Sequence, residues 1–289
     1  MLSATGTCGT ATAEAAVTVG PSLEVEILSP LEGQLFNRPD VLVQGLVHDS
    51  QAARLGVVVD GRPALVDGNR FYANHVPLVP GNNTIALFAR DSDGRVGTSM
   101  LQLVHQKPER YVEVTPFAQW GTAPFESSLR VDGNFDLIDP VLSGHGPGPV
   151  KFNSTEEDGA YRMRIADPGM YRVTLSAADQ SGEIFSDEVF VRIVDRQVLD
   201  GELHGLWDDM KSALAEQDME AVVSCFTRDN RDLYLEIFTT LYDDLPLIAA
   251  NMLPIEMITA DEECIKYRIA KQELYGGELL TITHHAYFT

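Results

Sequence analysis

Residues 77–94, Pro-Leu-Val-Pro-Gly-Asn-Asn-Thr-Ile-Ala-Leu-Phe-Ala-Arg-Asp-Ser-Asp-Gly, decide the fold class of the first part of the chain. A tight turn at Pro80-Gly81-Asn82 leads into the apolar-rich run 83–90, and Asp93-Gly94 closes it with a second turn. Glycine, asparagine and aspartate are the residues that tolerate the backbone of such turns. The stretch therefore predicts one strand bounded by two tight turns.

The same pattern extends in both directions from this stretch. Asp60-Gly61 and Asp67-Gly68 supply further hairpin tips between runs rich in Val, Leu, Ile, Phe and Tyr. The predicted strands are 24–28, 41–47, 54–59, 64–66, 70–76, 83–90 and 95–104. Seven short strands at this spacing predict a β-sandwich.

Several of these residues also match a known family. They are Ser29-Pro30 with Gly33, Val43-x-Gly45, Val59-Asp60-Gly61, Pro80-Gly81-Asn82-Asn83-Thr84-Ile85, and Ala89-x-Asp91-x-Asp93-Gly94. Residues 21–106 resemble a bacterial immunoglobulin-like module of the glucodextranase B-domain type. The resemblance implies a spacer or accessory domain with no catalytic residues to carry over.

A second β module is expected over residues 107–198, after a linker at Lys107-Pro108. Gly121-Thr122-Ala123-Pro124 precedes a strand at 126–131, and the segment 167–175 leads into a last strand at 187–194. This arrangement is similar to a PKD-type immunoglobulin-like domain. The Trp-Asp-Phe-Gly-Asp-Gly centre of that family is replaced by residues 131–150, and we interpret the glycine-rich 144–148 as a flexible connection.

Residues 1–20 resemble the closing strands of a further module of this kind. Two strands alone are marginally stable. We therefore expect the chain to be a segment of a longer reading frame whose preceding module has been cut, as in the stalks of secreted and surface proteins.

The pattern changes to a helical one in the last predicted domain, 199–289. Spacings of three and four place one set of apolar residues on a single face of a helix over 200–216: Leu203, Leu206, Trp207, Met210 and Leu214. Further helices are predicted at 219–226, 228–241 and 243–253, and strands at 255–259, 263–272 and 278–288. Helices followed by an antiparallel sheet make an α+β domain, smaller than the tandem sandwiches that give the chain its mainly β class.

The opening of this domain resembles that of the NTF2-like, or cystatin-like cone, domains. The match is carried by Trp207-x-x-Met210-x-x-Ala213-Leu214 and by Asp218-x-x-Ala221-Val222-x-x-Cys225-Phe226. The resemblance implies helices packed on a curved antiparallel sheet. Since that family usually has another strand, we expect the domain to be truncated at its C-terminus.

Charge excludes two classes of partner. The chain of 289 residues holds 43 acidic and 21 basic side chains, for a net charge of −22. So acidic a surface is repelled by nucleic-acid phosphates and by anionic lipid headgroups. No apolar run reaches the roughly 18 residues of a membrane-spanning helix, so we expect no membrane insertion by this segment.

Two adjacent histidines are the catalytic candidates. His284 and His285 lie on a predicted strand, so alternation sends one ring to each face of the sheet. Resemblance to NTF2-like enzymes, in which a cavity histidine or aspartate acts as acid or base, pairs them with Asp208. No partner stands at a diagnostic spacing, and a structural histidine is the favoured interpretation.

An acidic loop provides the metal candidates. Asp132, Asn134 and Asp136 stand at spacings of two, with Asp139 close by. Leu137 and Ser143 occupy positions where an EF-hand needs glycine and a bidentate glutamate, which excludes that motif. A looser calcium site is an alternative to a plain acidic loop, and no other cofactor is expected.

We therefore predict that the chain is not an enzyme. It reads as a non-catalytic segment of a large bacterial extracellular or cell-surface protein, in which immunoglobulin-like modules act as spacer or adhesion units and present an α+β binding domain. The partner would be a protein or a glycan, with flanking modules covalently continuous. The alternatives are an accessory region of a secreted carbohydrate-active enzyme, or a cone that binds or turns over a small ligand.

Overall fold

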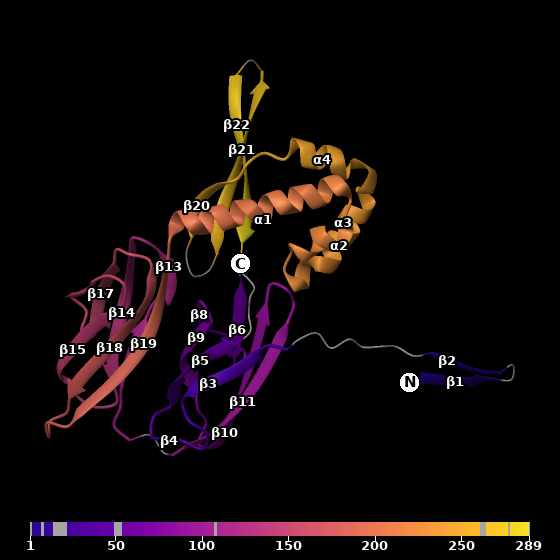
Figure 1. The fold of residues 1–289 in the computed structure, drawn as a ribbon. Coiled ribbons are helices and arrows are strands. Elements are labelled where there is room, and N and C mark those ends of the chain that lie inside the picture. Colours follow the sequence, from indigo (N-terminus) through magenta and orange to yellow (C-terminus); the bar gives the residue numbers. More distant parts are fainter. Residues whose placement is uncertain are drawn as a thin grey trace. The chain divides into compact units, whose positions relative to one another are not determined.

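The computed structural model describes residues 2–6, 9–13, 22–48, 54–106, 109–260, 264–276 and 278–288. It divides the chain into two compact units, Met1–Glu109 and Arg110–Thr289 (Figure 1). In the described residues no helix is long and apolar enough to span a membrane.

The N-terminal residues form a hairpin of two antiparallel strands, β1 (Leu2–Gly6) and β2 (Gly9–Ala13). Two strands fit the expected closing pair of a module. The remainder of that prediction, including Cys8 and the run up to residue 20, lies outside the described residues.

The first sandwich consists of two sheets over a shared core. One sheet has the order β3-β5-β9-β8, namely Glu24–Ser29, Asp40–His48, Arg70–Pro77 and Leu65–Asp67. The other has the order β4-β11-β10-β6-β7, namely Leu35–Phe36, Val96–His105, Gly81–Asp91, Leu55–Val59 and Arg62–Pro63. The strands alternate between buried and exposed residues, and Val43, Phe71 and Val59 are fully buried between the sheets.

This strand order is that of the immunoglobulin fold. With β3, β5, β6, β8, β9, β10 and β11 taken as strands A, B, C, D, E, F and G, the two sheets read ABED and GFC. All seven predicted strands are present, with ends shifted by two residues at most. The two additional strands, β4 and β7, have two residues each.

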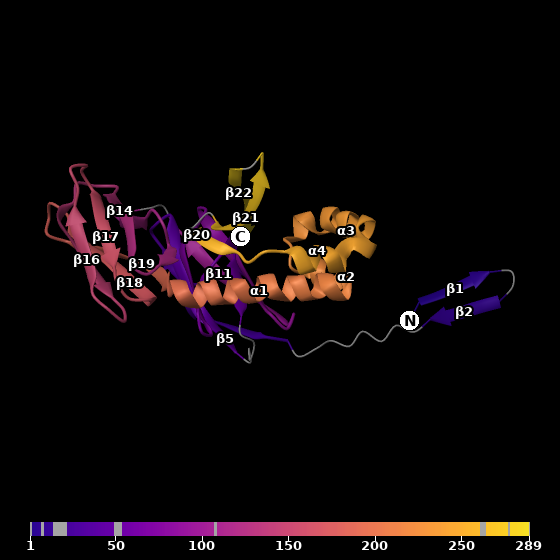
Figure 2. The same ribbon diagram turned by 90° about the horizontal axis from the view of Figure 1, so that it is seen from above.

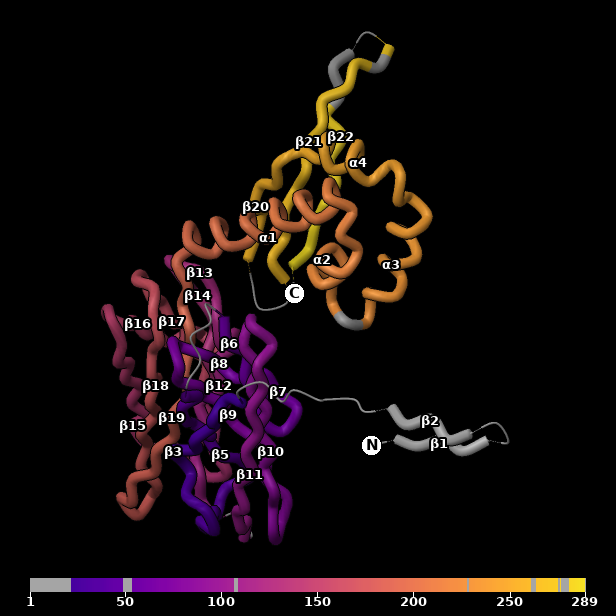
Figure 3. The backbone as a smooth tube through the Cα atoms, turned by 45° about the vertical axis from the view of Figure 1, so that its right-hand side comes forward, coloured from indigo at the N-terminus to yellow at the C-terminus, as the bar shows by residue number. Residues whose placement is uncertain are grey.

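The second sandwich, whose strands β12 to β19 are labelled in Figure 3, has the same strand order. Its ABED sheet is β12-β14-β17-β16, namely Val112–Pro116, Phe125–Gly133, Ala160–Ile165 and Val150–Ser154. Its other sheet is β13-β19-β18-β15, namely Trp120–Thr122, Ile184–Val194, Gly169–Ala178 and Ile138–His145. Both modules are therefore immunoglobulin-like.

One tyrosine fixes the corner before strand F of this module. Tyr171 is fully buried at the start of β18, and its hydroxyl donates to the carbonyl of Asp167, 2.9 Å away. This is the tyrosine corner of immunoglobulin-like folds. The expected flexible connection at 144–148 is partly wrong, because Gly144 and His145 end strand β15 and pair with β18.

Four helices precede the last sheet. They are α1 (Arg196–Glu216), α2 (Met219–Ser224), α3 (Arg231–Thr240) and α4 (Leu245–Asn251). Helix α1 begins four residues before its predicted start because Asp195 caps it, accepting hydrogen bonds from the N–H groups of Gln197 and Val198. Figures 1 and 2 show α2, α3 and α4 gathered at the C-terminal end of α1.

The sheet of this domain is antiparallel, with the order β20-β21-β22. Its strands are Glu256–Ala260, Ile265–Tyr275 and Glu278–Phe288. The first half of α1 contacts the sheet through Leu203, which packs with Ile255 and Tyr267. The second half packs on the other helices, where Leu214, Val222 and Leu245 are buried.

Candidate functional site

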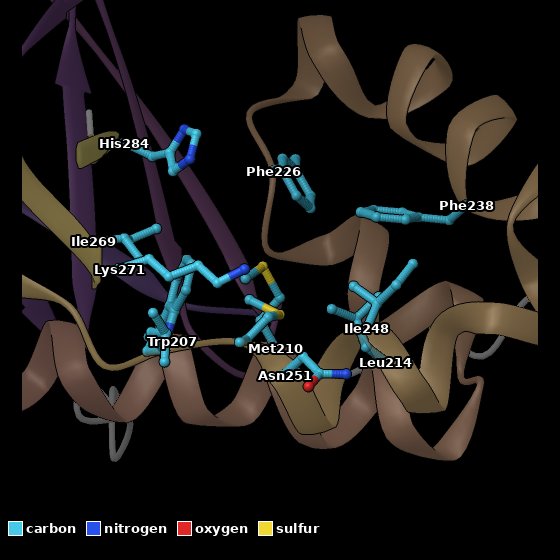
Figure 4. Close-up of a pocket in the computed structure, with 12 residues that line it drawn as sticks. Trp207, Met210, Leu214, Phe226, Phe238, Ile248, Asn251, Ile269, Lys271 and His284 are labelled. Carbon is cyan, nitrogen blue, oxygen red and sulfur yellow. The ribbon is translucent and has the colours of Figure 1, made fainter. Parts of the chain in front are cut away.

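A pocket of about 400 Å³ opens between the helices and the sheet of the C-terminal domain (Figure 4). Its lining is mostly apolar. The lining residues are Trp207, Met210, Leu214, Phe226, Phe238, Ile248, Asn251, Met252, Leu253, Ile269, Lys271 and His284. Concave apolar sites of this size with a few polar groups are the usual places where proteins bind small molecules.

Helix α1 forms one side of the pocket. Trp207, Met210 and Leu214 recur at spacings of three and four, which puts them on one face of the helix. The indole N–H of Trp207 donates to the carbonyl of Leu253, 3.3 Å away. This bond holds the indole against the segment that joins α4 to the sheet.

Aromatic rings form the helical end. Phe226 follows α2, and its ring centroid lies 3.8 Å from that of Tyr234 and 5.7 Å from that of Phe238, both on α3. Such clusters keep large side chains in fixed orientations. Ile248, Asn251 and Met252 complete this end from α4 and the residue after it.

The sheet supplies the polar side. Ile269 on β21 is paired with His284 on β22, and Lys271 follows two residues after Ile269 on the same face. The ammonium of Lys271 lies 2.5 Å from a carboxylate oxygen of Glu273. Within the described part of the chain, the His284 ring has no hydrogen bond, ion pair or ring contact.

The structure separates the three catalytic candidates. His284 lines the pocket, whereas His285 projects to the other face of β22, where its ring centroid lies 6.4 Å from that of Tyr287. Asp208 is exposed on α1 and lies 3.9 Å from the ammonium of Lys211. No carboxylate is among the lining residues of this pocket, so Asp208 and His284 do not share it.

Three of the four calcium candidates have a protein partner. Asp132 lies 3.4 Å from Arg130, Asn134 accepts a hydrogen bond from the N–H of Tyr111, and Asp136 lies 3.4 Å from the amide of Gln180. Among the described residues, the carboxylates of Asp132, Asp136 and Asp139 do not form a group with their oxygens within 4.8 Å of one another. The carboxylates of the acidic loop therefore do not gather around one point in this structure.

Sequence reasoning missed most of the pocket. Trp207, Met210 and Leu214 were predicted as an apolar helix face but not as the wall of a cavity. Alternation along the predicted strand 263–272 contained the signal that Ile269 and Lys271 share a face. Nothing in the sequence indicated that this face meets Phe226 and Phe238.

Comparisons with known proteins give the following. No family model matches the chain, and no curated protein matches it. The fibronectin(III)-like modules of CbhA from Clostridium thermocellum are similar at 16% identity, over 60% of this chain and 95% of theirs, with a TM-score of 0.24. SGBP-B of the Bacteroides ovatus mixed-linkage glucan utilization locus, solved with a heptasaccharide, is similar at 12% identity, over 61% of this chain and 48% of its own, with a TM-score of 0.22.

Titin contributes a further similar structure. Its I-band fragment I67–I69 is 10% identical over 60% of this chain and 66% of its own, with a TM-score of 0.24. The chain spans about half the length of SGBP-B and two thirds of the titin fragment. The strand order described above, rather than these likenesses, identifies the two sandwiches as immunoglobulin-like.

Proposed function

We propose that this protein is a non-catalytic, modular binding protein in which two immunoglobulin-like sandwiches are spacers for a C-terminal domain that binds a small, largely apolar ligand. The observation that carries the proposal is the pocket of about 400 Å³ walled by aromatic and methionine side chains. Methionine and aromatic walls adapt to apolar ligands of varied shape.

The composition of the lining supports binding rather than turnover. Its titratable side chains are those of His284 and Lys271, and Asp208 is not among the lining residues. Catalysis needs a set of groups in defined geometry around one substrate atom. A mostly apolar cavity with a few polar groups on one side is suited to recognition.

The spacer role is supported by the cores of the sandwiches. Each is filled by a continuous apolar cluster, with Val43 and Phe71 fully buried in the first and Tyr171 and Leu175 in the second. Such cores support rigid modules. We extend the proposal to glucodextranase B-like and PKD-like identities for the two modules, an NTF2-like identity for the third domain, and a place in a longer bacterial extracellular or cell-surface protein.

Binding of N-phenyl-1-naphthylamine, a neutral apolar dye, to the full chain tests the pocket. Ile248→Trp puts an indole into the cavity, whereas Leu247→Trp adds the same side chain at a position that is 65% exposed on the same helix. We expect dye affinity to fall at least about tenfold in Ile248→Trp, because lost apolar burial costs about 25 cal/mol per Å².

The Leu247→Trp variant should bind the dye like the unsubstituted chain. Circular dichroism of both variants checks that the fold is retained. A folded Ile248→Trp protein with unchanged dye binding, or a chain that binds no dye, would overturn the proposed function.

A further inference from the structure

We propose that the ligand of this pocket is an amphipathic carboxylate, with its acid group at Lys271 and His284 and its apolar tail among Met210, Phe226 and Phe238. The inference rests on the proposed function and adds the chemical class of the ligand. It is drawn from where charge, hydrogen-bonding groups and apolar surface lie within the cavity.

The charge of the pocket is opposite to that of its domain. Residues 201–289 hold 17 acidic and 6 basic side chains, a net of −11. Yet the lining contains one formal charge, the ammonium of Lys271, and no carboxylate. A cation inside an otherwise acidic domain gives the cavity a local preference for an anionic group.

Polar and apolar groups lie at opposite sides of the cavity. Figure 4 shows His284, Ile269 and Lys271 on the sheet side, and Phe238, Ile248 and Leu214 on the helical side. A ligand that satisfies both sides has a charged head and a hydrocarbon tail. The tail would run along α1, whose Met210 lies between the two sides.

The helical end offers a carboxylate no positive charge. Its polar lining residue, Asn251, is neutral, and one of its two side-chain N–H groups donates to the carbonyl of Leu247, 2.7 Å away. Donors are found on the sheet side, where an imidazole and an ammonium lie on one face of adjacent strands.

Glu273 pairs with the ammonium of Lys271. Both partners of the Lys271–Glu273 pair are half-exposed, at 59% and 45% of their side-chain surface. Exposed ion pairs contribute little to stability. A ligand carboxylate inside the pocket can therefore replace Glu273 as the partner of the ammonium at little cost in free energy. Water screens an ion pair inside the pocket less than it screens the exposed Lys271–Glu273 pair.

The test compares three amphiphiles of one chain length on the full protein: decanoate, 1-decanol and decyltrimethylammonium. Isothermal titration calorimetry or dye displacement gives each affinity. We expect decanoate to bind about tenfold more tightly than decanol, the ratio expected for one partly exposed charge-assisted hydrogen bond. The ammonium amphiphile should bind least tightly.

Variants separate the two head-group contacts. Lys271→Met should weaken decanoate about tenfold and leave decanol unchanged. Glu273→Gln releases the ammonium and should tighten decanoate a few-fold, a gain that misfolding cannot produce. His284→Ala should weaken decanoate, whereas His285→Ala on the other face of the same strand should not.

Tail length tests the orientation. From octanoate to decanoate, affinity should rise about fourfold per methylene group as each enters the cavity. Equal affinities for decanoate and decanol, or a Lys271→Met variant with unchanged decanoate binding, would overturn the carboxylate assignment and leave the apolar pocket standing. Failure of all three amphiphiles and of the neutral dye would overturn the proposed function itself.

Discussion

Asp91 and Asp179 occupy equivalent positions in the two sandwiches. Each stands where strand F ends, and each side chain is fully buried while its Oδ1 accepts hydrogen bonds from the N–H groups two and four residues later. The backbones match as well, since Gly94 and Gly182 donate to the carbonyls of Asp91 and Asp179 at 3.1 and 3.0 Å. One turn design therefore closes the F–G hairpin of both modules.

The two carboxylates differ in their cationic partner. Asp91 pairs with Arg95 of its own turn, 2.8 Å away, whereas Asp179 pairs with Arg110, which stands two residues before the first strand of its module. In the second module the turn aspartate therefore also binds the segment that leads into the first strand.

We expect Asp91→Ala to destabilise the first sandwich by about 3 kcal/mol, because it leaves two turn N–H groups without their acceptor and removes the buried carboxylate that pairs with Arg95. Hydrogen exchange of peptides from residues 22–106 measures this locally in the full chain. Asp93→Ala is the matched control in the same turn, since Asp93 is 61% exposed, and should change stability by less than about 0.5 kcal/mol. Equal protection in the two variants would show that the buried carboxylate is not what closes the turn.

Acid should destabilise the second sandwich through Asp179. The hydrogen bond from the Ser181 hydroxyl, together with those from the N–H groups of Ser181 and Glu183, outweighs burial and holds the pKa of Asp179 below its ordinary value. A group whose pKa is lowered by folding stabilises the fold above its unfolded pKa of about 3.9 and loses that contribution as pH falls through the folded pKa.

The free energy of unfolding is measured with urea at pH values from 7 to 2. Hydrogen exchange of residues 110–194 shows whether the change lies in the second sandwich. Asp179→Asn removes the titrating group and should flatten the pH dependence below about pH 4. A variant as acid-sensitive as the unsubstituted protein would assign the effect to other carboxylates.

These turns show what local sequence could predict. Asp93-Gly94 was expected as a turn, because the short side chain of aspartate bonds to the nearby backbone and glycine tolerates the turn conformation whatever surrounds them. The helices were predicted for a similar reason, since the spacing of Leu203, Leu206 and Met210 is set by the helix itself.

Features that depend on distant partners were not predicted. Strand β4 is two residues long and exists through its parallel pairing with β11, some 69 residues later. The pocket has the same origin, because the pairing of β21 with β22 places Lys271 and His284 on one side of the cavity and tertiary packing brings Phe238 to the other. The local sequence pattern of one segment does not show which distant segment it will contact.

Tyr267→Phe should destabilise the C-terminal domain by about 1 kcal/mol. Tyr267 is fully buried on β21, and its hydroxyl donates to Oδ1 of Asp200 on α1, 2.7 Å away, which ties the sheet to the helix. Burial and the nearby Asp200 raise the pKa of Tyr267, so the hydroxyl remains a donor through neutral pH. Tyr287→Phe, at a side chain 59% exposed, is the control, and loss of protection in residues 264–276 of the first variant alone is the expected outcome.

A pair of strand glycines in the first sandwich provides the sharpest test of its packing. Gly45 on β5 lies under the buried ring of Phe71, and a Cβ there would fall 2.6 Å from the ring and against the carbonyl oxygen of Glu26. The backbone of Glu26 cannot move away without breaking the pairing of β3 with β5. Gly45→Ala should therefore destabilise the module by about 2–3 kcal/mol or prevent it from folding.

Gly56→Ala is the matched control on β6. A Cβ at Gly56 meets its nearest neighbour, the carbonyl oxygen of Arg90, at 3.8 Å, which is ordinary contact. Because alanine also lowers the conformational entropy of the unfolded chain, this substitution should be neutral or stabilise the sandwich by up to about 1 kcal/mol. Urea unfolding of both variants measures the difference; a tolerated Gly45→Ala would mean that Phe71 and strand β3 can repack, and that the close approach of the two strands is not required by the fold.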